Sequence, residues 1–295
     1  MTGASPFIAI VLRNDALMIT PSRRPHARRS GYPMTLSLRA LFVASLAFIG
    51  SFAHAAEPAE TESPTVVLVH GAFADASSWE PVITALQSRK LRVIAMANPL
   101  RGPAWDSAQL SGLIATLDGP MVLVGHSYGG VLISNAALPT DRVKALVFVS
   151  AFSPDAGETV GALAQQMPGS TLGEALAMPV SLASGGNDLY ISPDRFHAQF
   201  AADLPLTQAR IMAVTQRPIR DAAFIEPVER ANWRQIPSWS IYGTADRNIP
   251  PELMAFMSQR AHATGVVLEG ASHVPMLSQP KAVAELILRA VDANP

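Results

Sequence analysis

Residues 121–130 read Met-Val-Leu-Val-Gly-His-Ser-Tyr-Gly-Gly. The short, continuous apolar run Met121–Gly125 predicts a strand buried on both faces, and residues 130–138 predict a helix. Ser127 therefore sits between two glycines in a strand–turn–helix setting, where a strained turn lifts a serine hydroxyl out of a sheet. A glycine-rich connection without chemistry is the alternative. The setting favours Ser127 as a catalytic nucleophile.

The same alternation of strand and helix continues on both sides of this motif. Further strands are predicted at Thr65–His70, Leu91–Ala97, Val143–Ala151, Pro237–Gly243 and Val266–Glu269, and further helices at Trp79–Arg89, Trp105–Leu117, Glu252–Ala261 and Lys281–Ala290. Strands joined by helices in this way predict an α/β fold with a doubly wound, mainly parallel sheet and right-handed crossovers. Catalytic groups are then expected at the carboxyl ends of the strands.

The segment from Phe152 to Trp233 interrupts that alternation. It contains helix-like pieces broken by proline and glycine, and no convincing strand. A bare loop of about eighty residues is too long for a compact domain. We therefore expect a helical lid, inserted at about residues 153–233 into a domain that spans residues 56–295.

A serine nucleophile needs a base and an acid that orients the base. Among the histidines after residue 56, His273 follows the last predicted strand and is the expected base. Asp246 follows the strand before it, which matches the chain order of serine, acid and histidine in this kind of fold. The rival acid is Asp155, beyond the strand Val143–Ala151.

The oxyanion formed during acyl transfer needs two hydrogen-bond donors. One is expected to be the backbone N–H of Tyr128, directly after the nucleophile. The other is expected from the loop after the first strand, with the N–H of Ala72 as first choice and that of Phe73 as the alternative.

The composition of the 295-residue chain excludes several classes of protein. Its net charge of −1 and the absence of long like-charge runs disfavour nucleic-acid binding. Because the chain has no cysteine, disulfides, thiolate catalysis and cysteine-ligated zinc are excluded. Metal-ligand spacings, a phosphate-binding P-loop and a dinucleotide fingerprint are also missing, so we expect no metal, no cofactor, and water as the only cosubstrate.

The N-terminal 55 residues are typical of targeting sequence. Residues 34–57 combine a short basic region holding Arg39, the apolar run Leu41–Gly50 and the small-residue site Ala53-His54-Ala55. The apolar run is shorter than the roughly 20 residues that span a bilayer. We expect cleavage before Ala56, export to the periplasm or medium, and no stable membrane anchor. Residues 1–33 are interpreted as a start assigned too early.

Four motifs together resemble the α/β-hydrolase superfamily over residues 65–292, and within it the small esterases related to plant methylesterases and hydroxynitrile lyases. They are His70-Gly71-Ala72-Phe73 followed by Trp79, Gly-His-Ser-Tyr-Gly-Gly, Gly-Thr-x-Asp-x-x-Ile-Pro-Pro, and Ser-His-x-Pro-Met. The lyases carry a hydroxyl side chain where Gly71 stands and a lysine where Val274 stands. The resemblance therefore implies ester hydrolysis rather than cyanide release.

The expected reaction is hydrolysis of an apolar carboxylic ester through an acyl-enzyme, by a monomer or homodimer. The expected pocket residues are Phe73, Phe152, Tyr190, Phe196 and Val274, with further apolar lid residues at Met167, Leu182 and Phe200. Hydrolysis of amides, lactones or carbon–carbon bonds and cofactor-free perhydrolysis use the same triad and remain open. A non-catalytic ligand receptor on the same scaffold is the alternative from another class.

Overall fold

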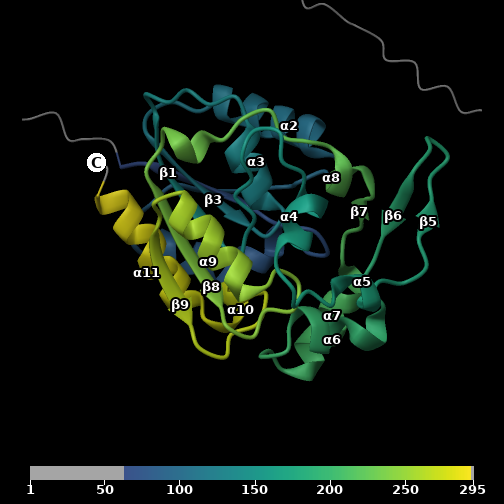
Figure 1. Cartoon of the computed structure of the whole chain (residues 1–295). Helices are drawn as coiled ribbons and strands as arrows, with labels where there is room; N and C mark the ends of the chain where they lie inside the picture. Colours follow the sequence, from purple (N-terminus) through teal and green to yellow (C-terminus); the bar gives the residue numbers. More distant parts are fainter. Residues whose placement is uncertain (1–62, 294–295) are drawn as a thin grey trace, which may run out of the picture. The chain divides into compact units, whose positions relative to one another are not determined.

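The computed structural model describes residues 63–293 (Figure 1). The expected signal peptide at residues 34–55 and its cleavage site lie outside these residues. No helix in the described range is both long and apolar enough to cross a membrane.

A six-stranded sheet with the order β2-β1-β3-β4-β8-β9 forms the centre, and its five pairings are all parallel. The strands are β1 (Thr65–Val69), β2 (Val93–Met96), β3 (Met121–His126), β4 (Val143–Val149), β8 (Ser238–Gly243) and β9 (Thr264–Leu268). All residues of β1, β3 and β8 are buried, as the continuous apolar runs of β1 and β3 predict. The prediction of a doubly wound parallel sheet is confirmed.

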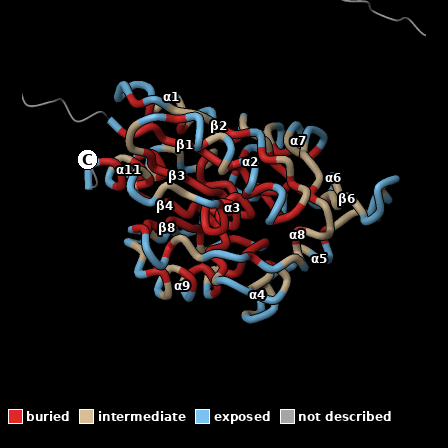
Figure 2. The backbone as a smooth tube through the Cα atoms, turned by 90° about the horizontal axis from the view of Figure 1, so that it is seen from above, coloured by how far each residue is buried: buried red, intermediate tan, exposed pale blue. Residues whose placement is uncertain are grey.

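Helices lie on both sides of the buried strands (Figure 2). They are the 3-10 turn η1 (Ala76–Trp79), α1 (Glu80–Ser88), α2 (Pro103–Ala115), α3 (Gly129–Asn135), α9 (Pro251–Arg260), α10 (Pro275–Ser278) and α11 (Pro280–Asp292). Helix α2 packs on α3, and α1 packs on α11. Buried apolar side chains of α11, such as Val283, Leu286 and Ile287, recur every three or four residues and face the sheet.

The segment between β4 and β8 contains α4 (Val160–Gln166), α5 (Leu172–Ala175), α6 (Pro193–Phe200), α7 (Leu206–Thr215), α8 (Ala222–Ile225) and η2 (Asn232–Arg234). It also contains β5 (Val180–Ser181), β6 (Asn187–Leu189) and β7 (Ile219–Arg220), which form a small antiparallel sheet. The expectation of no strand here was wrong. Each of these strands has only two or three residues, which is too short for an alternating pattern to be recognised in the sequence. The turn that joins β5 to β6 contains two glycines with a positive φ, Gly185 (83°) and Gly186 (76°).

Candidate active site

Ser127 occupies the sharp turn between β3 and α3 with a φ of 52°, in the left-handed region that a non-glycine residue seldom adopts. The turn is held because the N–H of Ser127 donates to Val149 O at 3.2 Å, while Ser127 O accepts from the N–H of Phe152 at 3.2 Å. A Cβ on Gly125 would lie 2.6 Å from the carbonyl oxygen of Gly129, which explains one glycine of the motif. The sequence therefore presents the hydroxyl at the carboxyl end of the central strand.

His273 and Asp246 meet at the same edge of the sheet. His273 Nδ1 lies 2.6 Å from Asp246 Oδ2, and both side chains are almost wholly buried. The other carboxylate oxygen, Oδ1, accepts the backbone N–H groups of Asn248 (2.8 Å) and Ile249 (3.0 Å). A carboxylate only accepts, so Nδ1 carries the proton and Nε2 presents a lone pair. The imidazole is thereby set up to act as a base.

The alternative acid, Asp155, is paired with an arginine and not with His273. Asp155 accepts a hydrogen bond from Arg234 Nε at 2.9 Å and forms an ion pair with the same guanidinium. This hydrogen bonding lowers the pKa of the Asp155 carboxyl. Asp246, not Asp155, is the carboxylate that contacts His273.

Ser127 and His273 line one cavity of about 470 Å³, part of it open to solvent. Within the described residues no hydrogen bond joins their side chains. In ligand-free enzymes such bonds are often long and tighten only when substrate binds. The arrangement brings hydroxyl, imidazole and carboxylate to one site.

Two of the backbone N–H groups at this cavity have no hydrogen-bond partner in the described part of the chain and lie where oxyanion donors are expected. They belong to Ala72 and Tyr128, and both residues line the cavity. The N–H of Phe73 instead donates to Arg217 O at 3.0 Å, so the alternative donor is already used. Of the two donors expected from the loop after β1, Ala72 is therefore the one that remains free to bind an oxyanion together with Tyr128.

Two neutral histidines support the site. His70 is fully buried, and this burial lowers its pKa to about 4. The N–H of Asn98 donates to His70 Nε2 at 3.0 Å, so Nδ1 carries the proton and donates to Gly71 O at 2.8 Å. Gly71 O belongs to the same peptide unit as the N–H of Ala72. His70 therefore holds the orientation of one unpaired amide.

His126, the residue before Ser127, supports the base in a similar way. Burial holds the pKa of His126 well below its usual range. His126 Nε2 donates to the backbone oxygen of His273 at 2.9 Å, and the two rings lie 4.9 Å apart. His126 thereby positions the backbone that carries the base.

Tyr128 contributes more than its amide. Its hydroxyl donates to Asp106 Oδ2 at 2.9 Å, and the buried Asp106 also accepts the N–H groups of Arg101 and Gly102. Burial beside this carboxylate raises the pKa of the Tyr128 phenol, which keeps it a hydrogen-bond donor. Sequence reasoning missed Asp106, because a lone aspartate in the first turn of α2 looks like an ordinary helix-terminal acid.

The cavity wall is mainly apolar. Phe73 and Phe152 line it, as expected, together with Phe200. Sequence reasoning missed Val160 and Ala164, although their spacing of four residues on α4 places them on one helical face.

Three expected pocket residues do not line the cavity. Phe196 is fully buried behind Phe200, with the two ring centroids 4.9 Å apart. Val274 is fully buried in the core. Tyr190 lies next to β6, where its backbone oxygen accepts the N–H of Ala177 at 2.8 Å. For Phe196, apolar character was the main sequence signal, and for Val274 it was the position directly after His273. Neither signal distinguishes a pocket wall from a core.

Gly71 lies against the nucleophile. A Cβ there would lie 2.5 Å from Ser127 Cβ and 3.1 Å from Ser127 Oγ. Glycine thus leaves the space beside the hydroxyl open. Among the described residues, no group of three or more histidine or acidic side chains is arranged to hold a metal ion.

Comparison with known proteins identifies the family to which the chain belongs. The model of the alpha/beta hydrolase family matches residues 66–286. Methylesterase 1 of Arabidopsis thaliana is 25% identical over 251 residues, which cover 77% of this chain and 95% of that protein. A pyrethroid hydrolase of Sphingobium wenxiniae is 26% identical over 256 residues, covering 77% and 88% respectively.

Among solved structures, polyneuridine aldehyde esterase superposes with a TM-score of 0.65 at 20% identity. The match covers 77% of this chain and 99% of that one. The expected resemblance to small esterases of the plant methylesterase type is confirmed by these matches.

Proposed function

The chain belongs to the alpha/beta hydrolase family, and on that premise we propose that it is a carboxylic-ester hydrolase that cleaves apolar esters through an acyl-enzyme. The observation that carries the proposal is the buried contact of 2.6 Å between His273 Nδ1 and Asp246 Oδ2, beside an apolar cavity that Ser127 lines. Relatives that are named as methylesterase, esterase and pyrethroid hydrolase support the reaction class.

Acylation begins when His273 Nε2 takes the proton of the Ser127 hydroxyl as its oxygen attacks the ester carbonyl carbon. Asp246 stabilises the imidazolium that forms. The N–H groups of Ala72 and Tyr128 bind the oxyanion, each contributing about 3 kcal/mol to the stabilisation of the transition state. His273 then returns the proton to the departing alkoxide, which leaves as the alcohol.

Deacylation repeats these steps with water. His273 removes a proton from the water, whose oxygen attacks the acyl carbon, and Ser127 leaves with that proton restored. The wall of Phe152, Val160 and Phe200 supplies apolar contact for the acyl group and nothing that would pair with a charged one. This chemistry needs no metal or cofactor.

The test is hydrolysis of short aryl esters by the wild type and by Ser127→Ala. The variant should lose at least about 10⁴-fold in kcat, because removal of the nucleophile leaves only binding and the oxyanion donors. Ser150→Ala is the matched control, since Ser150 also directly follows a strand of the central sheet and has a positive φ, but does not line the cavity.

Intact-mass measurement after reaction with an aryl phosphonate should show one adduct, at Ser127. Equal turnover by the Ser127→Ala variant would refute the mechanism. Tight binding of esters without turnover by the wild type would favour a ligand receptor instead.

We also propose that the protein is exported and processed before Ala56. The support is the sequence pattern at residues 34–57. N-terminal sequencing of the protein from culture medium or periplasm should begin at Ala56, and a full-length chain in the cytoplasm would contradict export.

A further inference from the structure

The cavity that contains Ser127, which we call the inner cavity, is partly open to solvent, and the exposure of its walls locates the opening. Most of the residues that line it are buried, among them Phe152 and Ile219. Solvent reaches the lining residues Ala164, Ser170, Leu172 and Phe224, of which the serine is exposed and the other three are half-buried. A passage from solvent must be bordered by residues that solvent reaches. These four residues, which we call the rim, therefore surround the opening.

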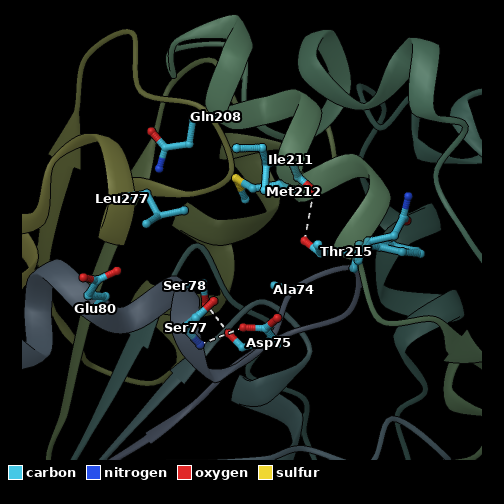
Figure 3. A pocket seen from close by; sticks show the side chains of 12 residues that line it. Ala74, Asp75, Ser77, Ser78, Glu80, Gln208, Ile211, Met212, Thr215 and Leu277 are labelled. Carbon is cyan, nitrogen blue, oxygen red and sulfur yellow. Dashed lines mark hydrogen bonds between the residues drawn. The ribbon is translucent and has the colours of Figure 1, made fainter.

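Toward α6 and α7 the inner cavity is closed. A larger cavity of about 640 Å³ lies there, and Figure 3 shows Ile211 of α7 facing Asp75 across it. Phe73 lines both cavities and is only 3% exposed, and its N–H donates to Arg217 O at 3.0 Å. Its ring packs edge-on against that of Phe200, which is 1% exposed, with 6.2 Å between the ring centroids. The two rings form a wall on this side and leave the rim as the way in.

One part of the rim lies where α4 meets α8. A Cβ on Gly161 of α4 would lie 2.8 Å from the backbone oxygen of Phe224, so glycine allows the two helices to touch there. Ala164 follows three residues later, about one helical turn along α4. The segment before α4 is tied to the body, because Arg260 Nη1 lies 2.7 Å from Glu158 Oε1. Phe224 and the helix that carries Ala164 are therefore held together.

The other part of the rim is attached to the loop after β8, which also carries the catalytic acid. Ser170 Oγ donates to Asn248 O at 2.9 Å, and the N–H of Thr171 donates to Arg247 O at 3.0 Å. Leu172 begins α5 directly after these bonds. Because both parts of the rim are tied to their surroundings, the sizes of the rim side chains set the width of the opening.

The rim is also mainly apolar. Ala164, Leu172 and Phe224 offer only hydrocarbon, and the hydroxyl proton of Ser170 is already given to Asn248 O. No lysine, arginine, aspartate or glutamate is among the described residues that line the inner cavity. A charged group would lose its water there without a partner of opposite charge, which is costly. The opening is therefore suited to neutral molecules.

Resting on the proposed ester hydrolysis, we propose that the ester reaches Ser127 between α4, α5 and α8, and that Ala164 and Phe224 are specificity-determining residues of this entrance. They set the widest group that a neutral ester can carry. Because the whole ester passes the rim, the limit applies to a wide acyl group and to a wide alcohol alike. A wall of a binding pocket would instead act on the one group that it contacts.

The test compares two esters that carry the same ring on opposite sides of the carbonyl group. Phenyl acetate has the ring in its alcohol, and methyl phenylacetate has it in its acyl group. Each kcat/KM is divided by that of methyl butyrate on the same preparation, so loss of folded protein cancels. Ala164→Phe narrows the opening and should lower both ratios by roughly 10-fold. Ala162→Phe is the matched control, because Ala162 is an exposed residue of the same helix that does not line the cavity.

Widening the opening is the converse test. Phe224→Ala should raise the ratios for 1-naphthyl acetate and for methyl 1-naphthylacetate, each by roughly 10-fold relative to methyl butyrate. Ile225→Ala should leave both ratios unchanged, because Ile225 is the next residue of α8, is 76% exposed and does not line the cavity.

Two results would overturn the entrance and leave the proposed function standing. One is a fall in only one of the two phenyl ratios in Ala164→Phe, which would make Ala164 a wall of a single subsite. The other is equal ratios in Ala164→Phe and Ala162→Phe while methyl butyrate is still hydrolysed. If the wild type hydrolyses no ester faster than Ser127→Ala does, the proposed function fails and the entrance for esters falls with it.

Discussion

His70 makes two buried hydrogen bonds that a pair of substitutions can separate. In His70→Asn, the side-chain amide can take the place of Nδ1–H and donate to Gly71 O, but it cannot reach the N–H of Asn98. In His70→Gln, the longer amide can accept that N–H in place of Nε2, but it no longer donates to Gly71 O. Each variant therefore keeps one of the bonds of 2.8 Å and 3.0 Å seen in the structure.

The two variants should lose similar stability but different activity. Each leaves one buried backbone group unpaired, which costs about 1–3 kcal/mol of the free energy of unfolding. Only His70→Gln releases the peptide unit that ends in the N–H of Ala72. Complete loss of an oxyanion donor costs about 10²–10³ in kcat, so partial misorientation should cost roughly 10-fold to 100-fold in this variant and under about 3-fold in His70→Asn.

The assay is kcat on an aryl ester together with the inhibition constant of a trifluoromethyl ketone, which presents an oxyanion to the same amides. Urea unfolding of each variant controls for stability. If kcat falls equally in His70→Asn and His70→Gln, the hydrogen bond to Gly71 O does not orient the oxyanion donor, and the reasoning fails.

Three further predictions follow from buried polar groups. Tyr128→Phe should lower the free energy of unfolding by about 1–3 kcal/mol, since Asp106 loses its phenol donor, while kcat stays within about 10-fold; a 10³-fold fall would show that the phenol takes part in the chemistry. Gln199→Ala should lower the free energy of unfolding by about 1–3 kcal/mol and lower kcat several-fold. The reason is that Gln199 Nε2 donates to Arg247 O (2.8 Å) and to Asn248 Oδ1 (3.1 Å) in the loop that carries Asp246. An unchanged kcat would show that this loop keeps its position without Gln199. His70 alone should lower stability by about 3 kcal/mol between pH 6.5 and pH 4, because the unfolded chain protonates His70 through this range while the folded chain, with its pKa lowered to about 4, largely does not. The lowered pKa of His126 acts in the same direction. A urea midpoint independent of pH in this range would contradict that cause.

The fold and the central residues could be predicted because their signals are local. Short apolar runs rich in valine and bounded by turn residues favour buried strands, and the Gly125-x-Ser127-x-Gly129 motif lies at the end of one of them. The placement of Asp246 and His273 follows from topology, since carboxyl ends of parallel strands share one edge. The hydrogen bond between the two side chains agrees with the pairing that the chain order predicted.

The pocket wall could not be predicted in the same way. Phe196 and Phe200 are both aromatic, both buried and both on α6, yet only Phe200 faces the cavity. Their difference depends on how α6 is rotated against the body, which is set by tertiary contacts. The short strands β5, β6 and β7 escaped prediction for the same reason, because backbone pairing between distant segments gives no periodic pattern in two or three residues.

Contacts across the domain connect the lid to the reaction geometry. Gln199 of α6 bonds to residues 247 and 248, whose loop supplies the N–H groups that hold Asp246 Oδ1. Asp203, just after α6, accepts a hydrogen bond from Ser272, the residue before the base. Displacement of α6 would therefore loosen the loops of acid and base together. Because the acid orients the base, we expect turnover to fall when α6 is displaced.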